Sequence, residues 1–537
     1  MYRTPKRPIF WKMLHELERI KHEFAQDNLP ASGLSDQLQV NLQSFREQLH
    51  SSTDLVIRSF HLGLPEHRET ALVFIDGLVD KKQVEWSILR PLMTEREANG
   101  DLRLGTNLLR YIESCLLTVG EVKFETESQQ VIASILAGST ALLVDGNATA
   151  IIVSTPGWEK RSLEQPDSEV NIRGPREGFI ESIRTNTALL RRKIGHPNLT
   201  FETMAVGQKS KTAVCIAYLK GITPDPLIRE IKRRIERIKT DIVVGAGGIE
   251  QFIEDEPLSL FSTIGYSERP DVVAAKITEG RAAIIIDGTP VVLTVPFLFV
   301  ENFQFPDDYN FHFIYATLLR WIRYVAFTIS FLCPAAYVAL STFHQELIPT
   351  SLLITMSASM EGTPFPTVVE IVVMGLLFEI IREGGIRLPK PVGQAISIVG
   401  ALVIGQATIQ AGLIDAPTVI VISVTAVTTF VAPTLVDETT PLRILLVVFA
   451  GILGAFGIMI GLLILLIHLA SLRSFGVPYL SPITPFAARE FLQDVAIRAP
   501  WWAMWKRPRM LVNNDPERQK FRLMPHPPED SKGGSSK

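Results

Sequence analysis

The sequence predicts an α/β cytosolic region of two related subdomains, followed by an all-α polytopic membrane domain. Two observations predict this fold class. Most of the apolar excess lies after about residue 310, in long runs that suit helices crossing a bilayer. Before that position, strand-like runs end in Asp-Gly pairs, and two of these runs belong to a longer internal repeat.

The composition disfavours several classes of function. Of 537 residues, 47% are hydrophobic and 20% are charged, so the chain is more apolar than a typical soluble protein, and its length requires more than one core. The net charge of −3 gives no electrostatic reason to expect a nucleic-acid partner. Cys115, Cys215 and Cys333 form no CxxC pair, and the ten histidines are scattered. We therefore expect no disulfide scaffold, no metal site, no cofactor, no catalytic residue and no enzymatic activity.

The chain begins with residues 1–50, which are polar and compatible with a helix, and we expect a peripheral N-terminal helical extension there. The basic N-terminus lacks the apolar segment of a secretory signal. The residues before the apolar half are therefore expected to stay in the cytoplasm.

Asp-Gly pairs between β-prone runs predict hairpin turns, because such turns need the positive φ that these residues tolerate. The three runs are residues 72–77, 141–146 and 283–288. No GxGxxG or Walker pattern surrounds them, which disfavours nucleotide binding. Residues 135–153 also match residues 277–295. This repeat predicts two related subdomains, at 51–175 and 176–310.

Between the repeats, residues 227–241 predict an amphipathic helix with Leu227, Ile231, Ile235 and Ile238 on its apolar face. Its basic residues form either a solvated face or a contact with acidic lipid or another subunit. The glycine-rich residues 245–248 predict a turn.

The apolar half, residues 311–475, is predicted to be a membrane domain of four to six helices. A span needs about 20 mainly apolar residues. The candidate spans are residues 322–343, 392–414, 417–436 and 444–470, with 347–360 and 367–381 as ambiguous segments. Small residues that allow close helix packing are Gly393, Ser397, Gly400 and Gly405.

Positive charges bear on orientation. They are Arg320 and Arg323, the 382–390 loop, and a basic and aromatic juxtamembrane tail at 476–522 that contains Trp501, Trp502 and Trp505 as an interfacial anchor. No one simple count of the predicted membrane spans places these three groups of positive charges all in the cytoplasm. We favour both termini in the cytoplasm, with the side of the C-terminus open and residues 523–537 disordered by composition.

Polar residues inside the apolar segments are the candidate gating or pore residues. Carboxylates in a span normally face the protein interior or a hydrated cavity. The candidates are Glu370, Glu379, Ser423, Thr425, Thr428 and Thr429. Ordinary helix packing is the alternative interpretation of the hydroxyl residues.

Residues 164–199 contain Pro166, Glu169, Arg173, Gly174, Pro175, Gly178, Phe179 and Glu181, followed by Asn186. This series resembles the signature of the A subunits of GerA-type spore germination receptors, a family that includes the stage V sporulation AF-like paralogues. Residues 269–309, 361–370 and 382–413 resemble the same family. The resemblance covers roughly residues 50–500.

The resemblance implies a multi-pass protein of the inner membrane of the spore, with its large N-terminal region cytoplasmic. It implies a transporter-like B subunit and a lipoprotein C subunit as partners, and a ring of A subunits that forms a nutrient-gated ion path or relays the germination signal. A membrane scaffold and a secondary transporter subunit are the alternatives.

Two interpretations of the signature stay open at this stage. It is either a subunit contact that transmits gating or a rigid joint between the subdomains, in which Arg173 and Arg176 pair with Glu169, Glu177 and Glu181.

Overall fold

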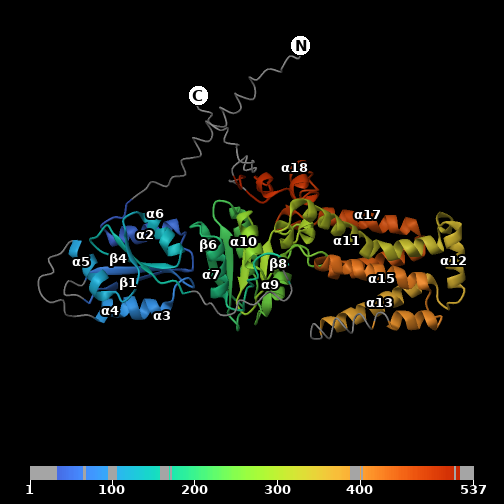
Figure 1. Cartoon of the computed structure of the whole chain (residues 1–537), viewed down its shortest axis with the longest axis horizontal. Coiled ribbons are helices and arrows are strands. Elements are labelled where there is room, and N and C mark those ends of the chain that lie inside the picture. Colours follow the sequence, from blue (N-terminus) through green and yellow to red (C-terminus); the bar gives the residue numbers. More distant parts are fainter. Residues whose placement is uncertain are drawn as a thin grey trace, which may run out of the picture.

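The computed structural model describes residues 33–63, 68–94, 106–157, 169, 172–387, 400, 403–512 and 516–519. Two α/β units lie side by side along the long axis of the molecule, and a helical region follows on the far side of the second unit (Figure 1). The N-terminal half is therefore α/β and the C-terminal half is helical, as the sequence predicts at this level.

The first unit is a sheet of five antiparallel strands in the order β1-β2-β4-β5-β3. The strands are β1 (Leu55–His61), β2 (Glu69–Ile75), β3 (Val122–Glu125), β4 (Ser139–Val144) and β5 (Ala150–Ser154). Helices α2 (Leu38–Gln48) and α6 (Ser128–Leu136) cover one face. The other face carries α3 (Lys81–Gln83), η1 (Val84–Leu89), α4 (Arg90–Thr94), α5 (Thr106–Tyr111) and η2 (Ile112–Leu116).

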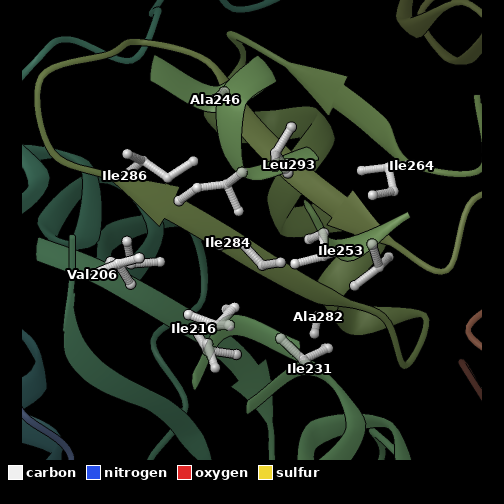
Figure 2. Packing of buried hydrophobic residues seen from close by; sticks show 14 of the residues in the cluster. Val206, Ile216, Ile231, Ala246, Ile253, Ile264, Ala282, Ile284, Ile286 and Leu293 are labelled. Atoms are coloured by element: carbon white, nitrogen blue, oxygen red, sulfur yellow. The ribbon is translucent and has the colours of Figure 1, made fainter. Parts of the chain in front are cut away.

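The second unit repeats this topology in the order β6-β7-β9-β10-β8. The strands are β6 (Leu199–Val206), β7 (Thr212–Leu219), β8 (Gly265–Ser267), β9 (Ala282–Ile286) and β10 (Val292–Val295). Helices α7 (Ile183–Lys193) and α10 (Pro270–Thr278) pack on one face, and α8 (Asp225–Glu236) and α9 (Gly245–Ile253) on the other. Figure 2 shows the core under α8 and α9, where Ile231 and Ile253 face Ile216 and Ile284 of the sheet.

Three expectations about the α/β region need correction. Residues 34–49 are not peripheral, because α2 buries its apolar face in the core of the first unit, so the predicted boundary at residue 50 falls too late. The Asp-Gly pair after β2 leads into α3 rather than a hairpin, whereas those after β4 and β9 do join paired strands. Residues 245–248 open helix α9 instead of forming a turn.

The helical region follows two 3-10 turns, η3 (Phe299–Phe303) and η4 (Pro306–Tyr309). Its elements are α11 (Phe313–Thr342), η5 (Gln345–Leu347), α12 (Thr350–Met360), α13 (Thr367–Ile386), α15 (Ala416–Val431), η6 (Pro433–Leu435), α16 (Val436–Leu453) and α17 (Ala455–Ser471). Among the described residues, α11 alone is long and apolar enough to cross a membrane as one helix. The pair α15 and α16, bent by 109°, would make a second such span.

The predicted span 444–470 is wrong as a single helix. The chain breaks at Gly454, where φ is +60°, and α16 and α17 fold back on each other. A Cβ added at Gly457 would lie 2.1 Å from the carbonyl oxygen of Phe449, so the turn depends on the absence of a side chain. Part of the predicted span 392–414 lies outside the described residues, namely 392–399, 401 and 402, which include Gly393 and Ser397.

The segment after α17 returns to the α/β region. It contains β11 (Arg473–Ser474), β12 (Val477–Pro478), α18 (Ala488–Glu490), η7 (Phe491–Val495) and η8 (Trp501–Ala503). Arg518 pairs with Glu279 at 3.2 Å, and Trp501 donates its Nε1–H to the carbonyl of Tyr309 at 3.1 Å. This part of the tail therefore binds the second unit and η4. The predicted disordered end, 523–537, lies outside the described residues.

Candidate functional site

The signature segment packs on the edge of the second α/β unit. Phe179 is buried in the core, and its N–H donates to the carbonyl of Glu268 at 2.7 Å. The Glu169 carboxylate accepts a hydrogen bond from Ser267 Oγ at 2.7 Å, and burial raises the pKa of Glu169. Gly174 and Pro175 are exposed, Gly178 is buried, and Pro166 lies outside the described residues.

The ion pairs expected within the signature are wrong. Arg173 and Arg176 are exposed, and neither pairs with a signature carboxylate in the described part of the chain. Glu177 instead pairs with Lys193 at 2.9 Å. The side chain of Glu181 is exposed, while its carbonyl accepts the N–H of Gly288 at 2.8 Å.

The second half of the signature contains a contact at the start of a helix that also occurs in the first unit. Asn186 accepts the N–H of Ile180 at 2.9 Å and donates to its carbonyl at 2.6 Å. In the first unit Asn41 does the same with Ser35, at 2.8 and 2.7 Å. The sequence carries the signal, because Gly33 and Asn41 have the same spacing as Gly178 and Asn186. This second repeat was not among the features predicted from the sequence.

The aspartates of two Asp-Gly turns bind the starts of the same two helices. Asp145 Oδ1 accepts the N–H of Leu38 at 3.0 Å, and Asp287 Oδ1 accepts the N–H of Ile183 at 3.1 Å. Each carboxylate thus satisfies a free N–H at the start of a helix, α2 or α7. These contacts hold the helices on their sheets, and they explain why the aspartates recur.

The rigid joint between the two units lies elsewhere, at Arg191 and Asp54. Arg191 Nε lies 3.1 Å from Asp54 Oδ2, and Nη2 lies 3.0 Å from Oδ1, which is a bidentate geometry. Both side chains are buried. Arg191 Nη1 also donates to the carbonyl of Leu199 at 2.8 Å, and the Thr53 N–H donates to the carbonyl of Phe201 at 2.9 Å.

A second buried ionic junction connects the second unit to the helical region. Asp308 of η4 binds Arg323 through two hydrogen bonds of 2.7 and 2.8 Å, and Arg320 lies 3.4 Å from the same carboxylate. Arg320 also pairs with Asp494 of the tail at 3.0 Å, and the Tyr309 hydroxyl donates to Asp494 at 2.9 Å. Arg320 and Arg323 are therefore members of a buried ion-pair network. From the sequence they were predicted only as indicators of membrane orientation.

The structure does not gather the candidate pore residues into one cluster. Glu370 is buried and accepts the N–H of Asp415 at 3.2 Å. Glu379 binds Arg382 at 2.6 Å and Arg443 at 3.0 Å. The two glutamates are nine positions apart on α13, about 13.5 Å along the helix. Asp415 is a site residue that the sequence analysis missed, because it falls between two predicted spans.

The four hydroxyl residues of α15 each donate to a carbonyl one turn earlier in their own helix, at 2.7 to 3.0 Å. Thr425 and Thr429 are buried, Thr428 is half-buried and Ser423 is exposed. Their hydrogen-bonding groups are thus satisfied locally, on two faces of the helix.

A family model described as "Bacillus/Clostridium GerA spore germination protein" matches residues 43–510 of this chain. The chain belongs to this family. Spore germination protein KA of Bacillus subtilis (strain 168) is 41% identical over 496 residues, which cover 92% of this chain and 90% of that protein. Spore germination protein GerLA of Bacillus cereus is 40% identical over 477 residues, covering 88% and 95%.

A solved structure also matches this GerA-family chain. It is the N-terminal domain of the A subunit of the Bacillus megaterium spore germinant receptor GerK3, with 35% identity, a TM-score of 0.40, and coverage of 50% of this chain and 98% of that chain. Family membership confirms the resemblance carried by the signature, and it makes the chain a member of the germinant receptor A subunit family.

Proposed function

We propose that this chain is a membrane subunit of a nutrient germinant receptor of spores, with residues 311–475 in the inner membrane and the two α/β units in the cytoplasm. The supporting observation is the inverted polarity of the helical region. Large apolar side chains such as Val427, Phe430 and Ile467 are 61–64% exposed, while Glu370 and Asp415 are 2% exposed. This arrangement suits an apolar solvent outside and polar groups inside.

We further propose that several copies form a ring around an ion path. The residues that we expect to face the path or gate it are Glu370, Glu379, Ser423, Thr425, Thr428 and Thr429. Ser423 is exposed in a single chain, where its hydroxyl would face lipid. In a ring of several copies the same hydroxyl would instead face a water-filled path. The C-terminal anchor at Trp501, Trp502 and Trp505 would lie at the membrane surface.

A transporter-like B subunit and a lipoprotein C subunit are the proposed partners. A change at the α/β units would reach the helices through stiff contacts, because the Arg191–Asp54 joint and the Asp308 junction are buried and charged. The exposed part of the signature, Arg173 to Pro175, is the surface that we propose contacts a neighbouring subunit.

The test is conductance of the receptor reconstituted with both partners in planar bilayers. We expect nutrient to open an ion current, and Glu370→Gln and Thr428→Val to change its size or selectivity. Glu346→Gln is the matched control, because its side chain is 74% exposed on the short 3-10 helix η5 of the same region. If neither variant alters ion flux or germination, the ion-path proposal fails.

Two further measurements separate the alternatives. A deletion of 392–470 that still supported germination would favour a scaffold. Uptake of labelled nutrient by the chain alone would favour a transporter.

A further inference from the structure

Three elements of the helical region bring oxygen atoms together at one point. Glu370 belongs to α13, Asp415 immediately precedes α15, and Tyr337 belongs to α11. The Asp415 N–H donates to Glu370 Oε2 at 3.2 Å, and the Tyr337 hydroxyl donates to Asp415 Oδ2 at 3.1 Å. Both carboxylates are buried in the bundle.

A fourth oxygen, the hydroxyl of Thr418, lies at this point. Thr418 is fully buried, and its Oγ1 lies beside the Glu370 carboxylate and the Tyr337 hydroxyl, but among the described residues no contact of this oxygen reaches hydrogen-bond geometry. Buried hydroxyls are normally paired, because an unpaired one loses its hydration without replacement. The Thr418 oxygen is thus free to contact a ligand held between the carboxylates.

The two carboxylates need more positive charge than the described residues supply. Asp415 caps α15, accepting the N–H of Thr418 at 2.7 Å, and a helix N-terminus stabilises one negative charge. Thr363, on the loop before α13, adds only a hydroxyl beside Glu370. Within the described residues, neither carboxylate has a salt bridge. The cations on α13 and α16, Arg382 and Arg443, are bound to Glu379, about 13.5 Å along the helix.

We propose that Glu370, Asp415, Thr418 and Tyr337 form a binding site for one small hard cation, either a proton or an alkali metal ion. Carboxylate and hydroxyl oxygens are the ligands that hard cations prefer. Two adjacent buried carboxylates cannot both stay charged without such a partner. The inference rests on the proposed ion path and names the ligand class at its carboxylate.

Occupancy of this site would hold α11, α13 and α15 together, because all three contribute oxygens. Release of the cation would leave two neighbouring buried negative charges and favour separation of α13 from the start of α15. The site would therefore couple the ionic state to the packing of the bundle.

The experiment measures the thermal unfolding midpoint of the full-length chain in lipid nanodiscs. In one series NaCl or KCl replaces N-methyl-D-glucamine chloride at constant ionic strength and pH, and in the other the pH rises from 5 to 9 at constant salt. An alkali ion at one hundred times its dissociation constant multiplies the ratio of folded to unfolded protein about 100-fold, so the midpoint rises. A bound proton instead makes the midpoint fall as pH rises.

Three variants decide the outcome. Glu370→Gln removes one charge with little change of shape, and we expect it to abolish the response while keeping the protein folded. Thr418→Val is expected to raise the cation concentration needed for half of the response. Glu361→Gln, at an exposed position near the same end of α13, should respond as the wild type does.

A wild type that responds to neither series, or a Glu370→Gln variant that responds fully, would overturn the cation site. Conductance recorded from the same preparations separates the two proposals. A chain that conducts without a Glu370-dependent response loses the cation site alone, and one that binds the cation without conducting loses the ion path alone.

Discussion

Replacing Asp54 with alanine is expected to loosen the joint between the two α/β units. The substitution leaves the Arg191 guanidinium, which is 1% exposed, without its carboxylate partner. Removing one member of a buried pair costs about 3–5 kcal/mol. Arg191 keeps its hydrogen bond to the Leu199 carbonyl, so we expect a loss near 3 kcal/mol, which is roughly a 150-fold change in the opening equilibrium.

The assay is hydrogen exchange of the full-length chain in detergent, followed by mass spectrometry of peptides from β1 and β6, the strands beside the joint. We expect exchange of these peptides in Asp54→Ala to accelerate by roughly two orders of magnitude. Asp241→Ala is the matched control, because its ion pair with Lys209 is exposed and contributes at most about 1 kcal/mol.

A double variant tests whether the unpaired charge causes the loss. Asp54→Ala combined with Arg191→Met removes both charges, so we expect it to exchange more slowly than Asp54→Ala alone. The reasoning is refuted if Asp54→Ala changes the exchange of β6 by less than about threefold, a loss of under 1 kcal/mol.

Three further outcomes are expected. Asp145→Ala and Asp287→Ala should each lower stability by about 1 kcal/mol, because they perform the same contact at two helix starts, and unequal losses in chemical denaturation would contradict the duplication. Gly457→Val should lower the unfolding midpoint and the yield of folded protein, because the carbonyl oxygen of Phe449 on α16 leaves no room for a side chain. Gly375→Ala is the control: the added Cβ meets no atom within 4 Å, so this variant should be neutral. Glu169→Gln should gain stability relative to the wild type as pH rises from about 4.5 to neutral. Burial raises the folded-state pKa of the wild-type carboxyl, so the wild type loses the stability that this group contributes as pH rises through that pKa. A stability difference between the two proteins that stays constant between about pH 5 and 7.5 would exclude this assignment.

The duplicated α/β region was predictable because its signals are local and repeated. Strands such as 282–286 are buried on both faces and read as continuous apolar runs, and the Asp-Gly pairs mark their ends. The amphipathic pattern of α8 placed Leu227, Ile231 and Ile235 in the core, as found. The predicted fold class is confirmed for the α/β region of two sheets, while the number of membrane spans stays a prediction.

The remaining differences come from tertiary contacts that a local pattern cannot show. Residues 38–48 are polar on average, which hid a helical spacing of Leu38, Leu42 and Phe45 whose place in the core only the packing under the first sheet confirms. The break at Gly454 was hidden because apolar composition is the same on both sides of it. Asp415 escaped notice since its importance depends on Glu370, which is 45 residues away in sequence.

The position of the signature gives a physical reason for its link to the helical region. Asp307 and Asp308 are consecutive residues of η4. The Asp307 carboxylate accepts the backbone N–H groups of Ile172 and Arg173, at 3.3 and 3.2 Å, while the Asp308 carboxylate holds Arg323 of the first apolar helix. A displacement of the exposed signature loop would therefore act on η4 one peptide bond away from the buried pair that fixes α11. Because Asp308 is fully buried and paired, it cannot follow such a displacement without moving α11 or breaking charged hydrogen bonds, and removing one partner from a buried pair costs about 3–5 kcal/mol.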